Sequence, residues 1–144
     1  MSNILPFKVG EVYEFTKTIT ETDVYLFAGI SGDFSRIHTN EEYMKKTRYK
    51  TRIAHGVISL ALASTVATMA QIEAKAELPS VSYGYDRLRF IKPVYFGDTL
   101  TAKYIITEVD EENLKTIAKV EVVNQRGEIV TAAFHILKFF PLEE

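Results

Sequence analysis

The residues best suited to chemistry lie between positions 31 and 56. Asp33 and His38 stand five positions apart, and His55-Gly56 opens a long apolar run. A histidine titrates near neutrality, and a partly desolvated aspartate can have its pKa raised, so such a pair can exchange protons at pH 7. A helix beginning at Gly56 would present backbone N–H groups that suit a developing negative charge. This stretch therefore predicts acid–base chemistry beside an oxyanion site.

The elements expected before and within this stretch are short. Alternation over residues 12–19 predicts a strand. Thr20 followed by acids predicts a helix start, and the helix would end at Gly29 or Gly32, which places Asp33 in a loop. Acids early and lysines late predict a second short helix over residues 39–47, followed by a loop over 48–52.

The remainder of the chain predicts one long helix and a sheet. Residues 55–70 are apolar on nearly every side, which predicts a buried helix. Period-two alternation from residue 82 onward, with short turns at 110–113 and 124–127, predicts antiparallel strands. We therefore expect an α+β fold in which an antiparallel β-sheet wraps around one long central helix, with residues 1–144 forming a single domain.

Composition excludes several classes of function. The 144 residues include no cysteine, which removes disulfides, thiolate nucleophiles and zinc–thiolate sites. A net charge of −2 gives no electrostatic case for nucleic acid, and three histidines in separate segments predict no metal site. Serine and threonine interrupt the apolar run, and the N-terminus lacks a basic start and apolar core, so we expect a soluble, cytoplasmic protein without a membrane span.

Two segments together resemble a known family. Ser31-Gly32-Asp33, Ile37-His38 and His55-Gly56 match the signature of the MaoC-like (R)-specific enoyl-CoA hydratases. Residues 88–100, LRFIKPVYFGDTL, resemble that family's Arg-Phe-x-x-Pro-Val-x-x-Gly-Asp segment. The resemblance covers nearly the whole chain and implies the hot-dog fold. Ser35 and Arg36 depart from it, because they replace the usual Asn-Pro pair.

The resemblance also implies roles for individual residues. Asp33 and His38 would hold a water between them and share the proton transfers that add it to trans-2-enoyl-CoA, or that dehydrate a 3-hydroxyacyl thioester in reverse. The amide of Gly56 would bind the thioester oxyanion, without metal or cofactor. Ser35, His55 and Ser64 are expected to support the substrate site, His55 mainly as a structural residue. His135 is interpreted as a packing or surface residue.

The implied partner is an acyl-CoA or acyl carrier protein thioester, bound by at least a homodimer. Tyr83, Tyr85, Arg87 and Arg89 alternate, which predicts one aromatic and basic face on a strand. For any single basic residue, a solvated surface cation is the simpler interpretation. The candidates for holding CoA phosphates are Arg36, Arg48, Lys50, Arg52, Arg87 and Arg89.

Three other functions stay open. A thioesterase of the hot-dog fold would hydrolyse the acyl-CoA and release free thiol. A dehydratase subunit working on acyl carrier protein would differ mainly in its basic surface. A non-catalytic acyl-thioester-binding or structural subunit is favoured by the loss of the Asn-Pro pair, while retention of both Asp33 and His38 argues against it.

Overall fold

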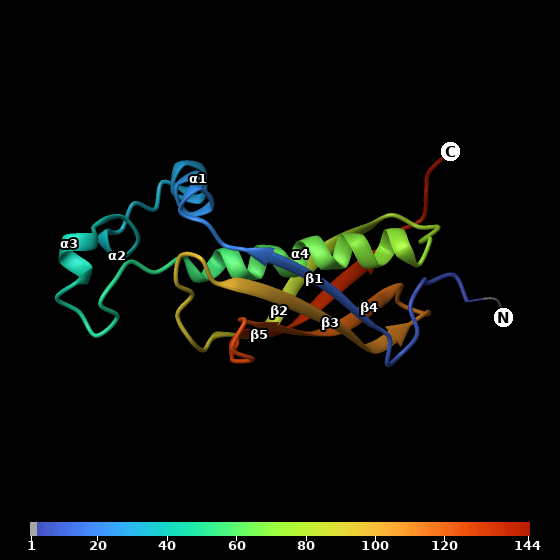
Figure 1. Ribbon diagram of the computed structural model, residues 1–144. Coiled ribbons are helices and arrows are strands. Elements are labelled where there is room, and N and C mark those ends of the chain that lie inside the picture. The colour runs from blue at the N-terminus through green and yellow to red at the C-terminus, as the bar shows by residue number, and fades with distance from the viewer. Residues whose placement is uncertain (1–2) are drawn as a thin grey trace.

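The computed structural model describes residues 3–144 as a sheet, one long helix and three shorter helices (Figure 1). In chain order the elements are β1 (Val12–Thr18), α1 (Glu21–Ser31), α2 (Arg36–Thr39), α3 (Glu41–Met44), α4 (Gly56–Glu73), β2 (Ser80–Phe90), β3 (Thr99–Asp110), β4 (Lys115–Val123) and β5 (Ile129–Phe139).

The sheet has five strands in the order β1-β3-β4-β5-β2, and every neighbouring pair is antiparallel. Helix α4 lies along one face of this sheet, whereas α1, α2 and α3 are gathered at one end of the molecule (Figure 1). The arrangement confirms the predicted α+β fold, an antiparallel sheet around a long helix. It also places the chain segment with the candidate catalytic residues beyond one end of the sheet.

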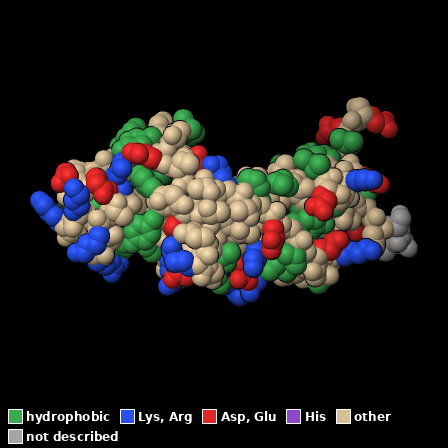
Figure 2. All heavy atoms as spheres, in the orientation of Figure 1, with side chains coloured by type: hydrophobic (Ala, Val, Ile, Leu, Met, Phe, Trp, Pro, Cys, Tyr) green, Lys and Arg blue, Asp and Glu red, His purple; other side chains and the backbone are tan. Residues whose placement is uncertain are grey.

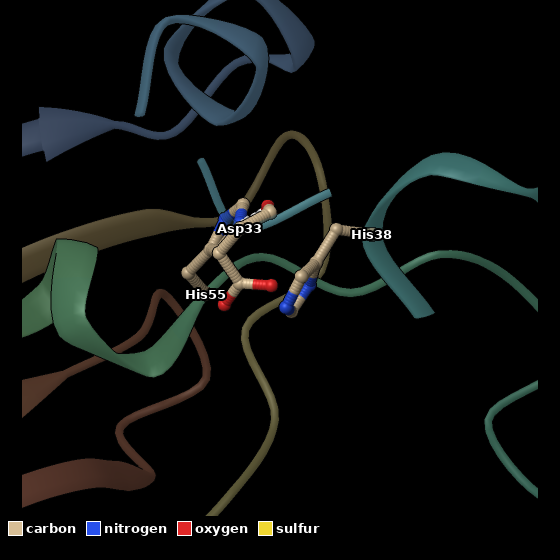
Figure 3. A group of neighbouring side chains, drawn as sticks. All are labelled: Asp33, His38 and His55. Carbon is tan, nitrogen blue, oxygen red and sulfur yellow. Dashed lines mark hydrogen bonds between the residues drawn. The ribbon is translucent and has the colours of Figure 1, made fainter. Parts of the chain in front are cut away.

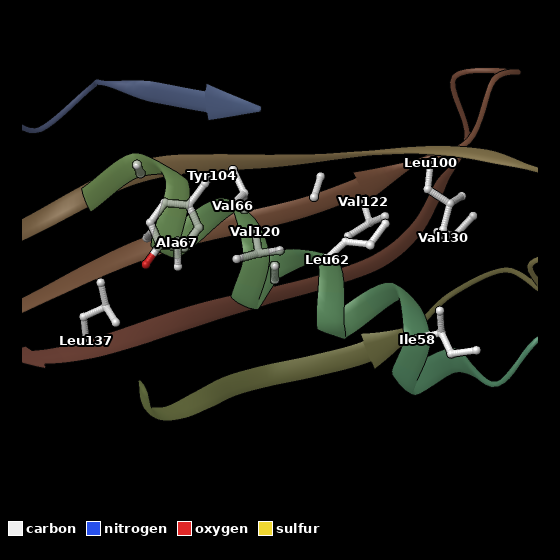
Figure 4. Close-up of a cluster of buried hydrophobic side chains, with 14 of the residues drawn as sticks. Ile58, Leu62, Val66, Ala67, Leu100, Tyr104, Val120, Val122, Val130 and Leu137 are labelled. Atoms are coloured by element: carbon white, nitrogen blue, oxygen red, sulfur yellow. The ribbon is translucent and has the colours of Figure 1, made fainter. Parts of the chain in front are cut away.

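The core forms where α4 meets the inward-facing residues of the strands (Figure 4). On β3 every second residue from Leu100 to Ile106 is buried, and the intervening residues are more exposed. Ile58, Leu62 and Val66 of α4 pack in the same cluster. Burying one such side chain contributes about 1.5–3 kcal/mol, so this packing holds α4, and therefore its N-terminal end, firmly against the sheet.

Helix α4 is not buried all round, and that prediction was wrong. Val57, Met69 and Ile72 are exposed, because a single sheet covers only one side of a helix. Among residues 3–144, α4 is the one helix long and apolar enough to cross a membrane, with a mean hydropathy of 1.3. A core helix has the same length and composition, and the buried side of α4 packs on the sheet.

The short elements before α4 follow the sequence with one exception. Thr20 and Asp23 form a capping box that starts α1, and Gly32, at φ 79°, ends it with its N–H bonded to the Ala28 carbonyl. The expected helix over residues 39–47 is instead two helices. Asn40 has extended backbone and accepts a hydrogen bond from the Tyr43 N–H, so it ends α2 and begins α3. His38 thereby lies in α2.

Strand β2 does not present the predicted aromatic and basic face. Its pairing with β5 shifts between Ser82 and Gly84 and again between Asp86 and Arg89. Each irregularity breaks the simple alternation of side chains. Tyr83 therefore points to solvent, whereas Tyr85 stacks on the buried ring of His135, with 4.5 Å between ring centroids.

Candidate active site

Three candidate residues meet beside the N-terminal end of α4. One carboxylate oxygen of Asp33 and one ring nitrogen each of His38 and His55 lie within 4.8 Å of one another. Figure 3 shows the Asp33 side chain alongside both imidazoles. Asp33 is exposed, whereas His38 and His55 are buried, so solvent can reach the site from the aspartate side.

His38 is held with one nitrogen available for chemistry. Its Nδ1–H donates to the Ile53 carbonyl oxygen at 2.7 Å, since a carbonyl can only accept. The unprotonated Nε2 is then left with a free lone pair. Burial lowers the pKa of His38 below its ordinary value, although the Ile53 carbonyl acts in the opposite direction. His38 is therefore set up as a base at neutral pH.

Asp33 lies in a turn that fixes its carboxylate. Its backbone N–H donates to the Ser31 hydroxyl at 3.2 Å, and its Oδ1 accepts from the Ser35 N–H, also at 3.2 Å. Such a turn is an ordinary role for an aspartate. Here it also directs the carboxylate toward the two imidazoles (Figure 3).

The departure at Ser35-Arg36 leaves this turn intact. Thr39 donates its hydroxyl hydrogen toward the carbonyls of Phe34 and Ser35, and the Arg36 guanidinium lies 4.4 Å from the centre of the Tyr43 ring. These contacts supply restraint at a position where proline would fix φ. The side chain of Ser35 itself is exposed and makes no capping bond to α2.

His55 and its neighbour Ala54 are held by contacts with both segments that carried the family resemblance. The Nε2–H of His55 donates to the Asp33 backbone carbonyl at 2.9 Å, and its ring packs on Phe27. The preceding residue is anchored from the second motif, because the Ala54 N–H donates to the Val94 carbonyl at 2.7 Å. The 88–100 segment thus supports the site from behind.

Gly56 is the first residue of α4, and its N–H finds no hydrogen-bond acceptor among residues 3–144. A Cβ at this position would lie 2.9 Å from Cδ1 of Phe90, so the close approach of this ring requires glycine. The buried Ser59 hydroxyl bonds the Gly56 carbonyl and Thr131 of β5, each at 2.6 Å. The helix start is therefore fixed to the sheet with a donor available.

Ser64 is not part of this cluster. Its side chain is exposed on α4, and no hydrogen bond joins it to the other candidates among the described residues. Its supporting role stays a prediction.

The proposed phosphate-binding cations differ in their surroundings. Arg52 pairs with Glu21 and Glu41, and Arg87 lies over the Phe134 ring. The end of the molecule formed by α2, α3 and the following loop nevertheless gathers Lys and Arg side chains (Figure 2). Exposed cations of this region are Arg36, Lys45, Lys46, Arg48 and Lys50.

An apolar cavity of about 360 Å³ adjoins the site, a feature not predicted from the sequence. It lies between β1, α1 and α4, and Phe27, which packs on His55, lines it. Neighbouring apolar residues at Leu26, Phe27 and Ile30 were the available sequence signal, but only the fold shows that they line one cavity with residues of α4. Further lining residues are Phe15, Ile19, Ile58, Ala61 and Leu62.

The same three polar residues are close enough to be considered as metal ligands. Each imidazole donates one N–H to a backbone carbonyl, which leaves one nitrogen of each ring with a lone pair. The two rings stack with a 27° angle between their planes, so their remaining lone pairs do not converge on one point as tetrahedral ligands must. The arrangement suits proton transfer better than metal binding.

Comparison with known proteins settles the family. The family model described as MaoC like domain matches residues 6–129. The chain belongs to the MaoC-like family. The MaoC-like domain adopts the hot-dog fold, as the resemblance implied: R-hydratase PhaJ1 from Pseudomonas aeruginosa, in the unliganded form, gives a TM-score of 0.79 at 31% identity, covering 99% of this chain and 93% of that chain.

Two curated relatives of this MaoC-like chain are named as enzymes. An (R)-specific enoyl-CoA hydratase from Rhodospirillum rubrum is 41% identical over 100 residues, covering 69% of this chain and 66% of the relative. A 3-hydroxybutyryl-CoA dehydratase from Methylorubrum extorquens is 33% identical over 105 residues, covering 73% and 64%. The chain thus matches just under two thirds of the length of each of these relatives.

Proposed function

We propose that this protein is an (R)-specific enoyl-CoA hydratase that adds water to trans-2-enoyl-CoA and, in reverse, dehydrates 3-hydroxyacyl-CoA. The observation that carries the proposal is the Asp33–His38 pair, in which a carboxylate lies beside an imidazole whose Nε2 is free to accept a proton. The names of the two curated relatives support a CoA-thioester substrate, and the (R)-specific name of the first supports the stereochemistry.

In the proposed reaction, Asp33 and His38 hold one water. Its oxygen bonds to the β-carbon of the enoyl thioester, and His38 Nε2 takes the proton that the water loses. The electron pair of the double bond moves to the thioester as an enolate. A proton then passes from the pair to the α-carbon, so that one water is added in total.

The Gly56 N–H is the proposed donor to the enolate oxygen. It lies at the positive end of an 18-residue helix and finds no acceptor among residues 3–144. Losing one such donor typically costs about 2.7–4 kcal/mol of transition-state stabilisation.

The apolar cavity beside Phe27 is the proposed site of the acyl chain. Its position next to His55 would let a chain leave the reacting carbons and enter apolar surroundings directly. Burying each CH₂ group there would contribute about 0.8 kcal/mol.

We further propose a homodimer in the cytoplasm. The exposed apolar side chains of α4, Val57, Met69 and Ile72, support an additional protein surface over this helix. Size-exclusion chromatography with light scattering tests the assembly, and a monomeric mass would contradict it.

Loss of enoyl-thioester absorbance tests the function. Purified protein with crotonyl-CoA should remove the absorbance without releasing free thiol, and mass spectrometry should find a product heavier by one water. Thiol release would instead indicate a thioesterase. Binding of the substrate without turnover would indicate the non-catalytic subunit.

A further inference from the structure

His55 contacts both proposed catalytic residues with different parts of its ring. Its Nε2–H bonds the backbone carbonyl of Asp33 at 2.9 Å, while its face lies 3.7 Å from the His38 ring between centroids. The His55 ring also packs on Phe27, with 4.8 Å between centroids. With only 3% of its surface exposed, His55 is buried.

We propose that His55 is a positioning residue for the hydration reaction, holding the Asp33 loop by its hydrogen bond and the His38 ring by stacking. This inference rests on the proposed function. The hydrogen bond matters because Asp33 itself is exposed, and its own turn contacts are made within residues 31–35. His55 joins that turn to the buried framework at the start of α4.

The stacked ring also controls the surroundings of His38. The titratable groups that act on His38 are Asp33, from the loop after α1, and His55, from the segment before α4. The His55 ring covers one face of the His38 ring and keeps water from it. Burial is the main reason that the pKa of His38 lies below its ordinary value, so removing this cover should raise it.

Two variants separate the two contacts. His55→Gln keeps an N–H that can reach the Asp33 carbonyl but removes the ring. His55→Phe keeps a ring against His38 but removes the donor. The buried Nδ1 of His55 has no hydrogen-bond partner among residues 3–144, so its loss in either variant breaks no further bond. Thermal unfolding confirms that each variant is folded before it is compared.

NMR titration reads the stacking directly, because the chain has only three histidines. His38 should titrate below about 6.5 in the unmodified protein and in His55→Phe, and move up toward 6.5 in His55→Gln. The Ser35 amide proton, bonded to Asp33, should exchange faster in His55→Phe than in His55→Gln. Identical His38 titrations in all three proteins, or equal Ser35 exchange, would overturn the proposal.

The pH dependence of kcat in the same two variants shows how each contact affects catalysis. His55→Phe should lose about tenfold in kcat, as expected for one lost hydrogen bond, and its acid limb should move less than that of His55→Gln because the ring still covers His38. His55→Gln should lose part of kcat even at high pH, because the His38 ring is no longer held by stacking, and should also shift the acid limb upward. A larger shift of the acid limb in His55→Phe than in His55→Gln would contradict the proposal. If the unmodified protein does not hydrate enoyl-CoA, the proposed function fails, while the NMR measurements still decide the role of His55.

Discussion

The imidazoles of His38 and His55 stack with 3.7 Å between their centroids and 27° between their planes. The two rings come from α2 and from the segment before α4, and each is tied to a backbone carbonyl through one nitrogen. The orientation of the His38 ring therefore depends on the positions of both α2 and the start of α4. Substitutions at the edges of the segment between α1 and α4 should act on catalysis.

Gly56→Ala is expected to lower kcat/KM by about tenfold to hundredfold. The added Cβ would lie 2.9 Å from the Phe90 ring, so the ring or the helix start must move, and the proposed oxyanion donor moves with it. Adding Phe90→Ala should restore part of the loss by removing the clash. Steady-state kinetics on enoyl-CoA checks this, and a double variant no better than Gly56→Ala would argue against the clash.

Ala61→Leu is expected to narrow the apolar cavity beside the site. Activity on crotonyl-CoA should change little, whereas activity on a longer trans-2-enoyl-CoA should fall about tenfold, since one or two methylenes in a pocket are worth about 1–3 kcal/mol. Thr68→Leu, exposed on α4 outside this cavity, is the matched control. An equal loss for both chain lengths would mean that the acyl chain lies elsewhere.

His135 should make the fold sensitive to acid. It is buried and bonded to Ser82 and Tyr104, and burial lowers its pKa to about 4. The unfolded chain, with a histidine pKa near 6.5, binds the proton first as the pH falls. Stability is therefore full above about pH 6.5 and falls by on the order of 3 kcal/mol by pH 4.

Urea unfolding between pH 7.5 and about 4.5 measures this dependence. His135→Gln should be less stable at neutral pH because a buried contact is lost, yet its stability should change less over the same interval. Parallel curves for the two proteins would show that His135 is not responsible.

Chelators are expected to leave activity unchanged. The lone pairs of the stacked imidazoles do not converge, so tight binding of a divalent ion by Asp33, His38 and His55 is not expected. The check is an assay before and after prolonged treatment with EDTA, with metal analysis of the protein. Loss of activity that added zinc restores would contradict this view.

Local sequence patterns accounted for the strands and the first helix because each depends on neighbouring residues. The Thr20 cap and the terminating Gly32 are examples. The break at Asn40 was missed, since the same residue both ends one helix and caps the next. The bulges in β2 were missed because the pairing with β5 is non-local.

The sequence predicts which residues form the candidate site, but not how they are arranged in space. Asp33 and His38 were identified from spacing and resemblance, and the structure brings them together. The stacking of His55 on His38 and the cover of Phe90 over Gly56 join segments distant in sequence, so no local pattern could indicate them. The exposure of one side of α4 was not predicted, because it depends on how much of the helix one sheet covers.

Hydration of crotonyl-CoA by the unmodified protein, Asp33→Asn and His38→Ala, with Glu112→Gln as control, decides whether Asp33 and His38 are the catalytic pair. Glu112 is exposed in the turn between β3 and β4, so its variant removes a charge away from the site. Each of the first two variants should lose at least about a hundredfold in kcat, and the control should lose none. Full activity in either Asp33→Asn or His38→Ala would contradict the assignment of this catalytic pair.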